Sequence, residues 1–590
     1  MSDLTDTAST PQGKGKPLLI TFLLIILASI IYLAYSAVQV QYHLARVKSQ
    51  LQQAAVLGVQ LNGQTAAELL RDVKLEIADA NKWASGPIWW TASHIPYLGR
   101  TPNAIHAVTE NLDRTLRATD NLEQALEKEN SNNSFRNYKF VLGLSDSLVE
   151  LQRPIASGAT ELTALRLAGV PEIVAGPVRQ LADGYSNLVP ITTDAVLFSK
   201  VAPALLGLDK PRKWMLVFQN GAEARSVGGF PGGWGILTAS TGKLSLSPLY
   251  KETTLMKQPL TNYSDYVSRE QAALYGSDLS RMSDLNLSPD FPTNARLMAA
   301  LEVRNFGTQI DGVMSMNEKS LANFMQVSGP VKVGKRTITS ENAADYVTKG
   351  VYQDYQNPKA KDAAIFLLIE KTFTKFQSGT VSPIRMLQAF IPAIHSQNLH
   401  AWSADNAVQQ KILQTPLSGS MANVNKPSAA VVLINGAGNK LDAYVKAQVV
   451  YNQGICESDF PYRDATMRVT LKNEAPTSGL PKYVTTRYDL GDLSPKNPGA
   501  TKMIVYVHVP FGSVFESAKI GNADTPLLVE GVDLGRTVFR FDVDLPAQSS
   551  QNLIIKFAEP AVGEVVQPSL WTQPMPNPVK TKVIAGLGCN

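Results

Sequence analysis

Three loops in the middle of the chain carry charged side chains of the kinds that handle phosphate groups. The first is the glycine-rich stretch NGAEARSVGGFPGGWG (220–235), the second is LYKETTL (249–255) and the third is RMSDLNLSPDFP (281–292). Their charged residues are Glu223, Arg225, Lys251, Glu252, Arg281, Asp284 and Asp290. We expect each loop to follow a strand or to lead into a helix, which is where α/β domains place their functional groups.

These residue types suit a site for a diphosphate held with Mg²⁺. Arginine clamps phosphate oxygens in a bidentate way, and carboxylates hold the Mg²⁺ that neutralises charge in phosphoryl transfer. The hypothesis assigns ligand binding to Arg225, Lys251 and Arg281, metal binding to Asp284 and Asp290, and catalysis to Arg225, Asp290 and Glu223. Mg²⁺ is the one cofactor that this pattern suggests.

The same residues also have a structural interpretation. Glu223 and Arg225 can pair with each other, and Asp284 and Asp290 can form turns and caps ahead of Pro292. The residues alone favour this interpretation over the catalytic one, and they leave open whether the protein is an enzyme.

Several familiar catalytic motifs are missing from the sequence. It contains no Walker pattern, no H-E-x-x-H, no C-x-x-C and no G-x-S-x-G, and its six histidines are scattered. The glycines of residues 220–235 miss the G-x-G-x-x-G spacing, and the segment after them has the pattern of a strand. Because nucleotide loops place the phosphate at a helix N-terminus, we do not expect one here.

A long apolar segment near the N-terminus predicts a membrane anchor. Residues 17–45 contain no Asp, Glu, Lys or Arg, and about 20 apolar residues span a bilayer. A cleaved signal peptide would have a shorter apolar region and a cleavage site, so a retained transmembrane helix over 17–40 is favoured. Residues 1–16 are then a cytoplasmic tail and the bulk of the chain is extracytoplasmic, although the flanking lysines and arginines barely discriminate the orientation.

Length, charge and cysteine content limit the classes of protein to which the chain can belong. A chain of 590 residues is too long for one core, and a net charge of +5 indicates no general affinity for nucleic acid. The two cysteines, Cys456 and Cys589, could form one disulfide in an oxidising compartment or remain two thiols. Both alternatives stay open.

The apolar spacing predicts three regions after the anchor. Residues 41–206 have helical periodicity and form a stalk or bundle; within it Trp89, Trp90 and Tyr97 could pack helices together or meet the bilayer surface. Residues 211–415 alternate strands and helices and form an α/β core, in which Asn317 caps a helix. Residues 425–590 contain strand patterns, among them YVTTRYDL (483–490) and TVFRFDVDL (537–545), and form a β-sandwich. The fold class is therefore multidomain α+β.

The first and third loops resemble a family of bacterial envelope proteins, domain-of-unknown-function family 4012. Its loop reads like N-N-A-E-x-R-P-T-G-G-F, and its D-x-N-x-S-P-D-F-P pattern is met in full at residues 284–292. In the first loop, the matching residues are Asn220, Ala222, Glu223, Arg225, Gly228, Gly229 and Phe230, and the departures are Gly221, Ser226 and Val227. The order of anchor, stalk, core and tail is also similar to this family, which has no assigned activity.

The order of elements is more distantly similar to the LytR-CpsA-Psr phosphotransferases, which move glycopolymers from polyprenyl diphosphate carriers onto the cell wall. Arg225 and Ser226 resemble the start of their R-S-D segment, but Val227 replaces its aspartate. Lys251 and Glu252 stand where that family has an Arg-Asp pair, and lysine lacks the fork geometry of arginine. The resemblance implies an α/β core of this type with a remodelled site.

Two functions follow from these resemblances. The favoured one is a single-pass protein of the bacterial cell membrane that acts without catalysis, as a binding or scaffolding protein of envelope assembly. The alternative is a phosphotransferase or binder for glycopolymers linked to polyprenyl (di)phosphate. The expected partners are the membrane, a polyprenyl-phosphate lipid or a wall glycopolymer, and envelope proteins.

Overall fold

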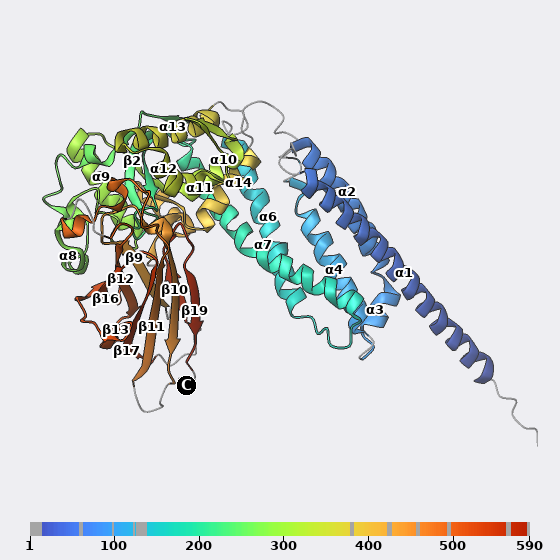
Figure 1. Ribbon diagram of the computed structural model, residues 1–590. Coiled ribbons are helices and arrows are strands. Elements are labelled where there is room, and N and C mark those ends of the chain that lie inside the picture. The colour runs from blue at the N-terminus through green and yellow to red at the C-terminus, as the bar shows by residue number, and fades with distance from the viewer. Residues whose placement is uncertain are drawn as a thin grey trace, which may run out of the picture. The chain divides into compact units, whose positions relative to one another are not determined.

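In the computed structural model shown in Figure 1, the chain comprises two compact units. The helical unit consists of Met1–Asn132 and Leu142–Val196, and the second unit of Asn133–Val141 and Leu197–Asn590. The structure describes residues 15–57, 63–96, 99–121, 124, 138–377, 383–421, 428–455, 461–491, 497–561 and 568–586. Cys456 and Cys589 lie outside the described residues, so their pairing stays a prediction.

Long helices build the helical unit, as the apolar spacing predicts. They are α1 (Gly15–Leu57), α2 (Gly63–Trp83), α3 (Pro87–Ser93), α4 (Arg100–Arg117), α6 (Tyr138–Thr163) and α7 (Glu172–Leu205), and α7 continues into the second unit. Helix α1 packs against α2 through a cluster around Val47, Val73 and Ile77. A second cluster joins α4, α6 and α7 and includes Val108 and Tyr185.

The predicted membrane anchor coincides with the first part of α1. The side chains of residues 17–26 lie outside the described residues, so the anchor stays a prediction. Among the residues that the structure describes, α7 is the helix whose length and apolar composition would allow it to cross a membrane. More than half of that apolar stretch is buried inside the protein, as in the core helix of a soluble bundle.

A mixed sheet forms the centre of the α/β core. Its strands are β1 (Arg212–Asn220), β2 (Phe230–Ser240), β3 (Lys243–Leu246), β4 (Tyr250–Lys251), β5 (Gly312–Met316) and β8 (Leu399–Ser403). The order is β3-β2-β1-β5-β8, with β4 paired to β2. Strands β1 and β5 are parallel, so their carboxyl ends meet at one edge of the sheet. The hairpin predicted at Thr241 and Gly242 joins β2 to β3.

Helices cover both faces of this sheet. They are α8 (Arg269–Tyr275), α9 (Phe291–Phe306), α10 (Glu318–Ser328), α11 (Ala343–Asp345), α12 (Val351–Asp354), α13 (Pro358–Gln377), α14 (Pro383–His395) and α15 (Asn406–Leu413). A small hairpin, β6 (Val331–Val333) and β7 (Arg336–Ile338), follows α10. Trp214, Leu216 and Phe218 of β1 face α10, α13 and α14. Met215 and Val217 face the side of α8 and α9, as the strand period of two requires.

Short turns of helix connect these elements. They are the 3₁₀ turns Glu252–Leu255, Tyr263–Asp265, Gly276–Ser280 and Pro416–Ser418 and the π-helical turn Tyr346–Gly350. As predicted, Asn317 caps α10: its side-chain oxygen accepts the backbone N–H groups of Lys319 (3.0 Å) and Ser320 (3.1 Å).

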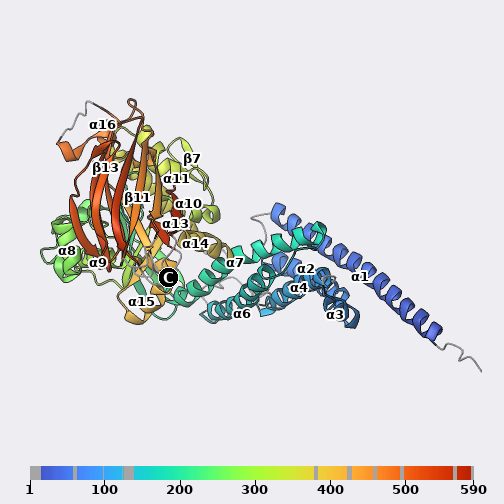
Figure 2. The same cartoon turned by 90° about the horizontal axis from the view of Figure 1, so that it is seen from below.

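Two sheets stack face to face in the C-terminal part, which confirms the predicted sandwich (Figure 2). The sheet orders are β14-β13-β17-β11-β10-β19 and β15-β16-β12-β9-β18. The strands are β9 (Ser428–Asn435), β10 (Val445–Gln453), β11 (Tyr462–Asn473), β12 (Thr501–Pro510), β13 (Val514–Ile520), β14 (Ala523–Asp524), β15 (Val529–Asp533), β16 (Arg536–Leu545), β17 (Ser549–Pro560), β18 (Ser569–Thr572) and β19 (Lys580–Ile584). Buried Met467, Phe541 and Phe557 lie between the sheets.

One strand prediction is wrong. YVTTRYDL (483–490) forms the helical turn α16 (Lys482–Thr485) and the 3₁₀ turn Tyr488–Leu490. Its β-branched and aromatic residues favour a strand, but tertiary contacts decide otherwise: the hydroxyl of Tyr483 donates to the carbonyl of Tyr355 at 2.8 Å. A further 3₁₀ turn, Asp442–Tyr444, leads into β10.

The α/β core and the sandwich share a hydrophobic core within the second unit. Val432 of β9, Tyr506 of β12 and Val538 of β16 lie on the outer face of the five-stranded sheet. They pack with Leu274 of α8 and Met298 of α9. The two regions expected as separate domains are therefore in direct contact over an apolar surface.

We expect Phe541→Ala to lower the free energy of unfolding of the second unit by about 3–5 kcal/mol, because it removes a fully buried aromatic side chain. The matched control is Phe511→Ala, since Phe511 is 65% exposed at the turn after β12. Denaturant unfolding followed by tryptophan fluorescence measures both. Equal losses for the two variants would contradict the sandwich core described here.

Candidate functional site

The glycine-rich loop (220–235) turns from β1 into β2, and its residues 221–229 are buried. The carbonyl of Ala224 accepts the N–H of Asn435 (3.0 Å), and the carboxylate of Asp442 accepts the N–H of Ala224 (2.7 Å). On another side, the hydroxyl of Ser226 donates to the carbonyl of Asn286 at 2.7 Å. The loop therefore joins the sheet, the third charged loop and the start of the sandwich, and strand β2 follows it, as the sequence predicts.

Two glycines are required for this turn. Gly228 and Gly229 have φ angles of 107° and 117°, which L side chains rarely adopt. A Cβ on Gly229 would also lie 2.5 Å from the backbone of Asn220. The glycine content thus serves a tight and buried connection.

Arg225 is part of this buried connection. Its guanidinium donates to the carboxylate of Glu223 (2.8 Å) and to the carbonyl of Ala224 (3.0 Å), and the Arg225 side chain is 6% exposed. The carboxylate of Asp284 lies 3.9 Å from the guanidinium. The geometry is that of the structural interpretation, in which Glu223 and Arg225 pair with each other.

Asp290 caps helix α9. Its carboxylate accepts the backbone N–H (3.1 Å) and the hydroxyl (2.7 Å) of Thr293, and also the hydroxyl of Ser420 at 2.9 Å. The Asp284 carboxylate accepts the hydroxyl of Ser283, and Arg281 is exposed. Among the described residues, no three His, Cys, Asp or Glu side chains come together as a metal site. The structure thus gives Asp290 a structural task and does not place it with Asp284 in such a cluster.

A cavity of about 240 Å³ lies where the carboxyl ends of β1 and β5 meet α10 and α13. Its basic residues are Lys251, Lys361 and Lys440, and its acidic residues are Glu223, Glu252, Glu318 and Asp362. Apolar side chains form the rest of the wall, among them Phe218, Met316, Leu321, Ile365, Phe366 and Ile369. The end of strands on a sheet of this kind is the expected place for a ligand site.

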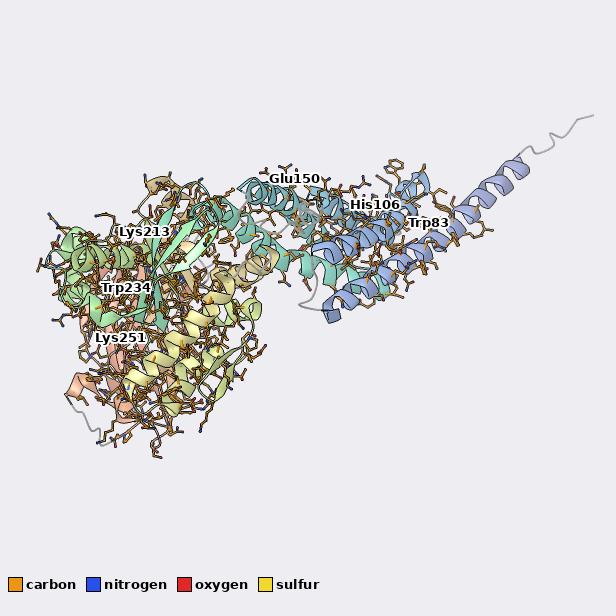
Figure 3. All side chains as sticks on the ribbon, turned by 90° about the horizontal axis from the view of Figure 1, so that it is seen from above. Trp83, His106, Glu150, Lys213, Trp234 and Lys251 are labelled. Carbon is orange, nitrogen blue, oxygen red and sulfur yellow. The ribbon has the colours of Figure 1, made fainter. Side chains whose placement is uncertain are left out.

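Only part of the predicted site reaches this cavity. Lys251 and Glu223 line it, and Figure 3 labels Lys251 on the second unit. Arg225 lies behind Glu223, while Arg281, Asp284 and Asp290 are absent from the wall. The structure therefore brings the first and second charged loops together at one cavity, whereas the third loop packs against the first without placing its charged residues in the cavity wall.

Two carboxylates hold the three lysines of the cavity. The Asp362 carboxylate pairs with Lys251 at 2.5 Å and also with Lys361, and Glu223 pairs with Lys440 as well as with Arg225. The hydrogen bond that Lys251 donates to Asp362 raises the pKa of Lys251, whereas burial lowers the pKa of Lys361. The ammonium groups are thus ordered around the cavity by carboxylates that an incoming anion would have to compete with.

Glu318 is a buried carboxyl at the first position of α10. It is 2% exposed and accepts the backbone N–H of Gly221 at 3.1 Å. Burial raises its pKa to about 7, because the charged form loses hydration that the backbone N–H groups of Glu318 and Gly221 do not replace. Its neighbour Lys319 donates instead to the carbonyl of Met575 at 2.6 Å. Glu318 is therefore poised to exchange a proton near neutral pH inside the cavity.

Gln219 and Tyr352 add polar groups to the same wall. Gln219 is 3% exposed, and its side-chain nitrogen has no hydrogen-bond partner among the described residues. The amide nitrogen of Asn220 donates to the hydroxyl of Tyr352 at 3.0 Å. An unpartnered buried donor is costly, and a ligand acceptor in the cavity would remove that cost.

Sequence reasoning missed most of the residues that line the cavity. Lys361 and Asp362 lie in an ordinary helix start, NPKAKDAAIF (357–366), and Lys440 lies in a loop before β10. Tyr483 was assigned to a strand. The one usable signal was Glu318, which follows a buried strand and a helix cap at the edge where ligand sites occur.

The second unit combines an α/β core that contains this cavity with a β-sandwich. Residues 209–352 of this core match the sequence model of the family described as protein of unknown function, DUF4012. The match supports the predicted family and assigns no activity. No curated protein and no solved structure matches the chain.

We expect Arg225→Ala to destabilise the second unit by about 3 kcal/mol or more, because breaking a buried ion pair leaves a buried carboxylate with one partner fewer. Arg281→Ala is the matched control; it removes the same charge from an exposed position and should change the stability by less than about 0.5 kcal/mol. Denaturant unfolding followed by the fluorescence of Trp214 and Trp234, both buried in this unit, measures the two variants. If Arg225→Ala proved as mild as its control, the structural role would be refuted.

A second prediction concerns pH. Because the folded pKa of Glu318 is about 7 against an ordinary 4.5, its favourable contribution is complete below pH 4.5 and is lost as the pH rises to about 7. At about 1.4 kcal/mol per pH unit, the loss is about 3 kcal/mol. Glu318→Gln should remove this pH-dependent loss of stability, because glutamine does not ionise. Its amide oxygen can still accept the N–H of Gly221.

The measurement is the free energy of unfolding of wild type and variant at several pH values between 4 and 8. The variant should gain stability relative to wild type as the pH rises through this window. Glu370→Gln, at an exposed position of α13, changes the same charge without the burial and should show no such trend. A stability difference for Glu318→Gln that is constant with pH would contradict the prediction.

Proposed function

We propose that the protein is a membrane-anchored, extracytoplasmic protein of the bacterial cell envelope that binds an anionic amphiphile in the α/β core and acts without catalysis. It would serve envelope assembly as a binding or scaffolding protein. The observation that carries the proposal is the cavity, which combines Lys251, Lys361 and Lys440 with an apolar wall.

The chemistry of the cavity suits a phosphate head joined to an apolar chain. Ammonium groups bind phosphate oxygens as point charges, and they are already ordered by Asp362 and Glu223. Phe218, Leu321 and Phe366 offer apolar contacts to a hydrocarbon chain in the same space. A volume of about 240 Å³ is smaller than the about 300–1,000 Å³ of sites that enclose a whole drug-sized ligand. The cavity would therefore hold the head and the first part of a longer chain, such as a polyprenyl phosphate.

The described part of α1 supports the anchor. Leu27, Ile30 and Ile31 are 54–60% exposed, and the sequence around them carries no charge from residue 17 to residue 45. Exposed aliphatic side chains along a long uncharged helix are unfavourable in water and favourable in a bilayer. The same proposal places residues 1–16 on the cytoplasmic side of the membrane.

The absence of catalysis is proposed because the groups first assigned to it have other tasks. Arg225 is committed to Glu223 and to backbone carbonyls, and Asp290 to the start of α9. The likeness to the LytR-CpsA-Psr core belongs to this proposal and rests on the order of hairpin, strand and helix. With Val227 in place of an acidic residue, that likeness favours binding over transfer.

Glu318 favours one alternative, a phosphotransferase acting on a glycopolymer linked to polyprenyl diphosphate. A buried carboxyl with a pKa of about 7 can accept the proton of an attacking hydroxyl at neutral pH. If this alternative holds, Glu318→Gln abolishes transfer and leaves binding intact. Transfer that persists in Glu318→Gln would leave the binding function as the conclusion.

We expect the full chain in detergent micelles to bind a polyprenyl phosphate, and Lys361→Ala or Lys440→Ala to weaken the binding about tenfold or more. Each removes a charge-assisted hydrogen bond worth about 1.5–3 kcal/mol. Lys335→Ala, which removes an exposed lysine between β6 and β7, is the control and should bind like wild type. The polyprenyl alcohol, which lacks the phosphate, should bind weakly to all of them.

Fluorescence or calorimetric titration gives the dissociation constants. The proposal fails if wild type prefers the alcohol to the phosphate, or if the two cavity variants bind the phosphate as tightly as Lys335→Ala does.

A further inference from the structure

An uncharged aromatic segment follows α2 in the helical unit. Residues 83–99, WASGPIWWTASHIPYLG, contain no Asp, Glu, Lys or Arg, and Lys82 and Arg100 flank them. Helix α3 lies within this segment. Trp90 is 65% exposed and Ile95 is 45% exposed, whereas Trp89 is buried. A large indole in water on an uncharged surface calls for an explanation, because Trp is normally well covered.

Contacts with α1 fix the level of this segment along that helix. The indole N–H of Trp89 donates to the hydroxyl of the buried Ser36 at 3.0 Å. The ring of Trp83, labelled in Figure 3, meets the ring of Tyr35 edge to face with centroids 5.6 Å apart. Val40 packs with Ala80 near the end of α2. The end of α2 and helix α3 therefore lie beside residues 35–40 of α1.

Residue types change sharply on the two sides of this level. Toward the N-terminus, α1 exposes apolar side chains, namely those of Leu27, Ile30 and Ile31. Toward the C-terminus, the first charged contacts are those of Glu76 with His43 (2.7 Å) and Arg46 (2.9 Å). From Ser36 to His43 the helix rises about 10 Å at 1.5 Å per residue. The uncharged segment thus occupies the boundary between an apolar and a charged layer.

We propose that α3 and the turn after it lie in the interfacial layer of the bilayer, with Trp90 and Ile95 against lipid. The proposal rests on the anchor proposed above for α1. Tryptophan favours this layer because its ring is apolar while its N–H can still meet a polar partner. No formal charge has to be desolvated, and the exposed Lys82 can extend its ammonium group toward lipid phosphates.

Such a contact gives the helical unit two attachments to the membrane, the anchor and the α3 surface. A single helix leaves a protein free to tilt and turn about the point where it leaves the bilayer. The ties from Trp89 to Ser36 and from Trp83 to Tyr35 hold α3 to that same point, so a lipid contact at Trp90 would restrict both motions. The α3 surface is thus a device that orients the helical unit on the membrane.

The test uses the full chain labelled with 5-fluorotryptophan and placed in nanodiscs of phosphatidylethanolamine and phosphatidylglycerol. The ¹⁹F resonance of Trp90 is assigned by its loss in Trp90→Phe, a change at an exposed position that should leave the fold intact. A lipid with a nitroxide at the top of its acyl chain should broaden this resonance away, and a gadolinium chelate in the water should leave it. Trp214 and Trp234, buried in the second unit, are internal controls that neither reagent should affect.

The possible results separate the two proposals. A Trp90 resonance that the chelate broadens and the nitroxide lipid spares, in a chain that purifies with the nanodiscs, overturns the α3 contact and leaves the anchor standing. A chain that separates from the nanodiscs overturns the anchor and the α3 contact together.

Discussion

The carboxylate of Glu223 is shared by two cations that belong to different parts of the second unit. Arg225 donates to one of its oxygens from within the buried loop, and Lys440 approaches the other from the segment between β9 and β10. Because Glu223 is 5% exposed, neither cation can be withdrawn without leaving a buried charge poorly compensated. The arrangement holds the loop against the sandwich and, through Lys440, sets a positive charge in the wall of the cavity. The junction of the two regions and the composition of the cavity therefore depend on the same ion triad.

Local sequence rules account for the elements around this triad. Alternation of apolar and polar residues locates β16, and Asn317 marks the start of α10 because its side chain satisfies N–H groups that the helix leaves free. The long apolar spacing of the helical unit likewise predicts helices. These features arise from interactions between residues that are close together in the chain, so a short segment of sequence is enough to predict them.

The candidate site depends on neighbours that are far apart in the chain. Lys251 and Asp362 are paired although 111 residues separate them, and no local pattern marks either one as a partner of the other. The sequence predicts that Arg225 binds a ligand, because arginine clamps phosphate oxygens and its loop lies at a strand end, where α/β domains place functional groups. Here, residues 435–442 of the sandwich cover the loop, and this turns the same arginine into a structural group. The family resemblance pointed to a segment that the family model also matches, residues 209–352. It carries no information on which side chains of that segment are buried, and burial decides the role of Arg225.

The pairs around the cavity also constrain how an anionic ligand can enter. Lys251 and Lys361 are already ordered by Asp362, so a phosphate group would not have to immobilise two free lysine side chains. It would compete with a carboxylate for cations whose cost of burial is already met by folding. The phosphate would still gain charge-assisted hydrogen bonds from the lysines, and the apolar wall formed by Phe218, Leu321 and Phe366 would add contacts to the hydrocarbon chain. On the function proposed above, the charged head and the apolar chain of an amphiphile would each use one half of the wall, whereas a small phosphate would use the charged half alone.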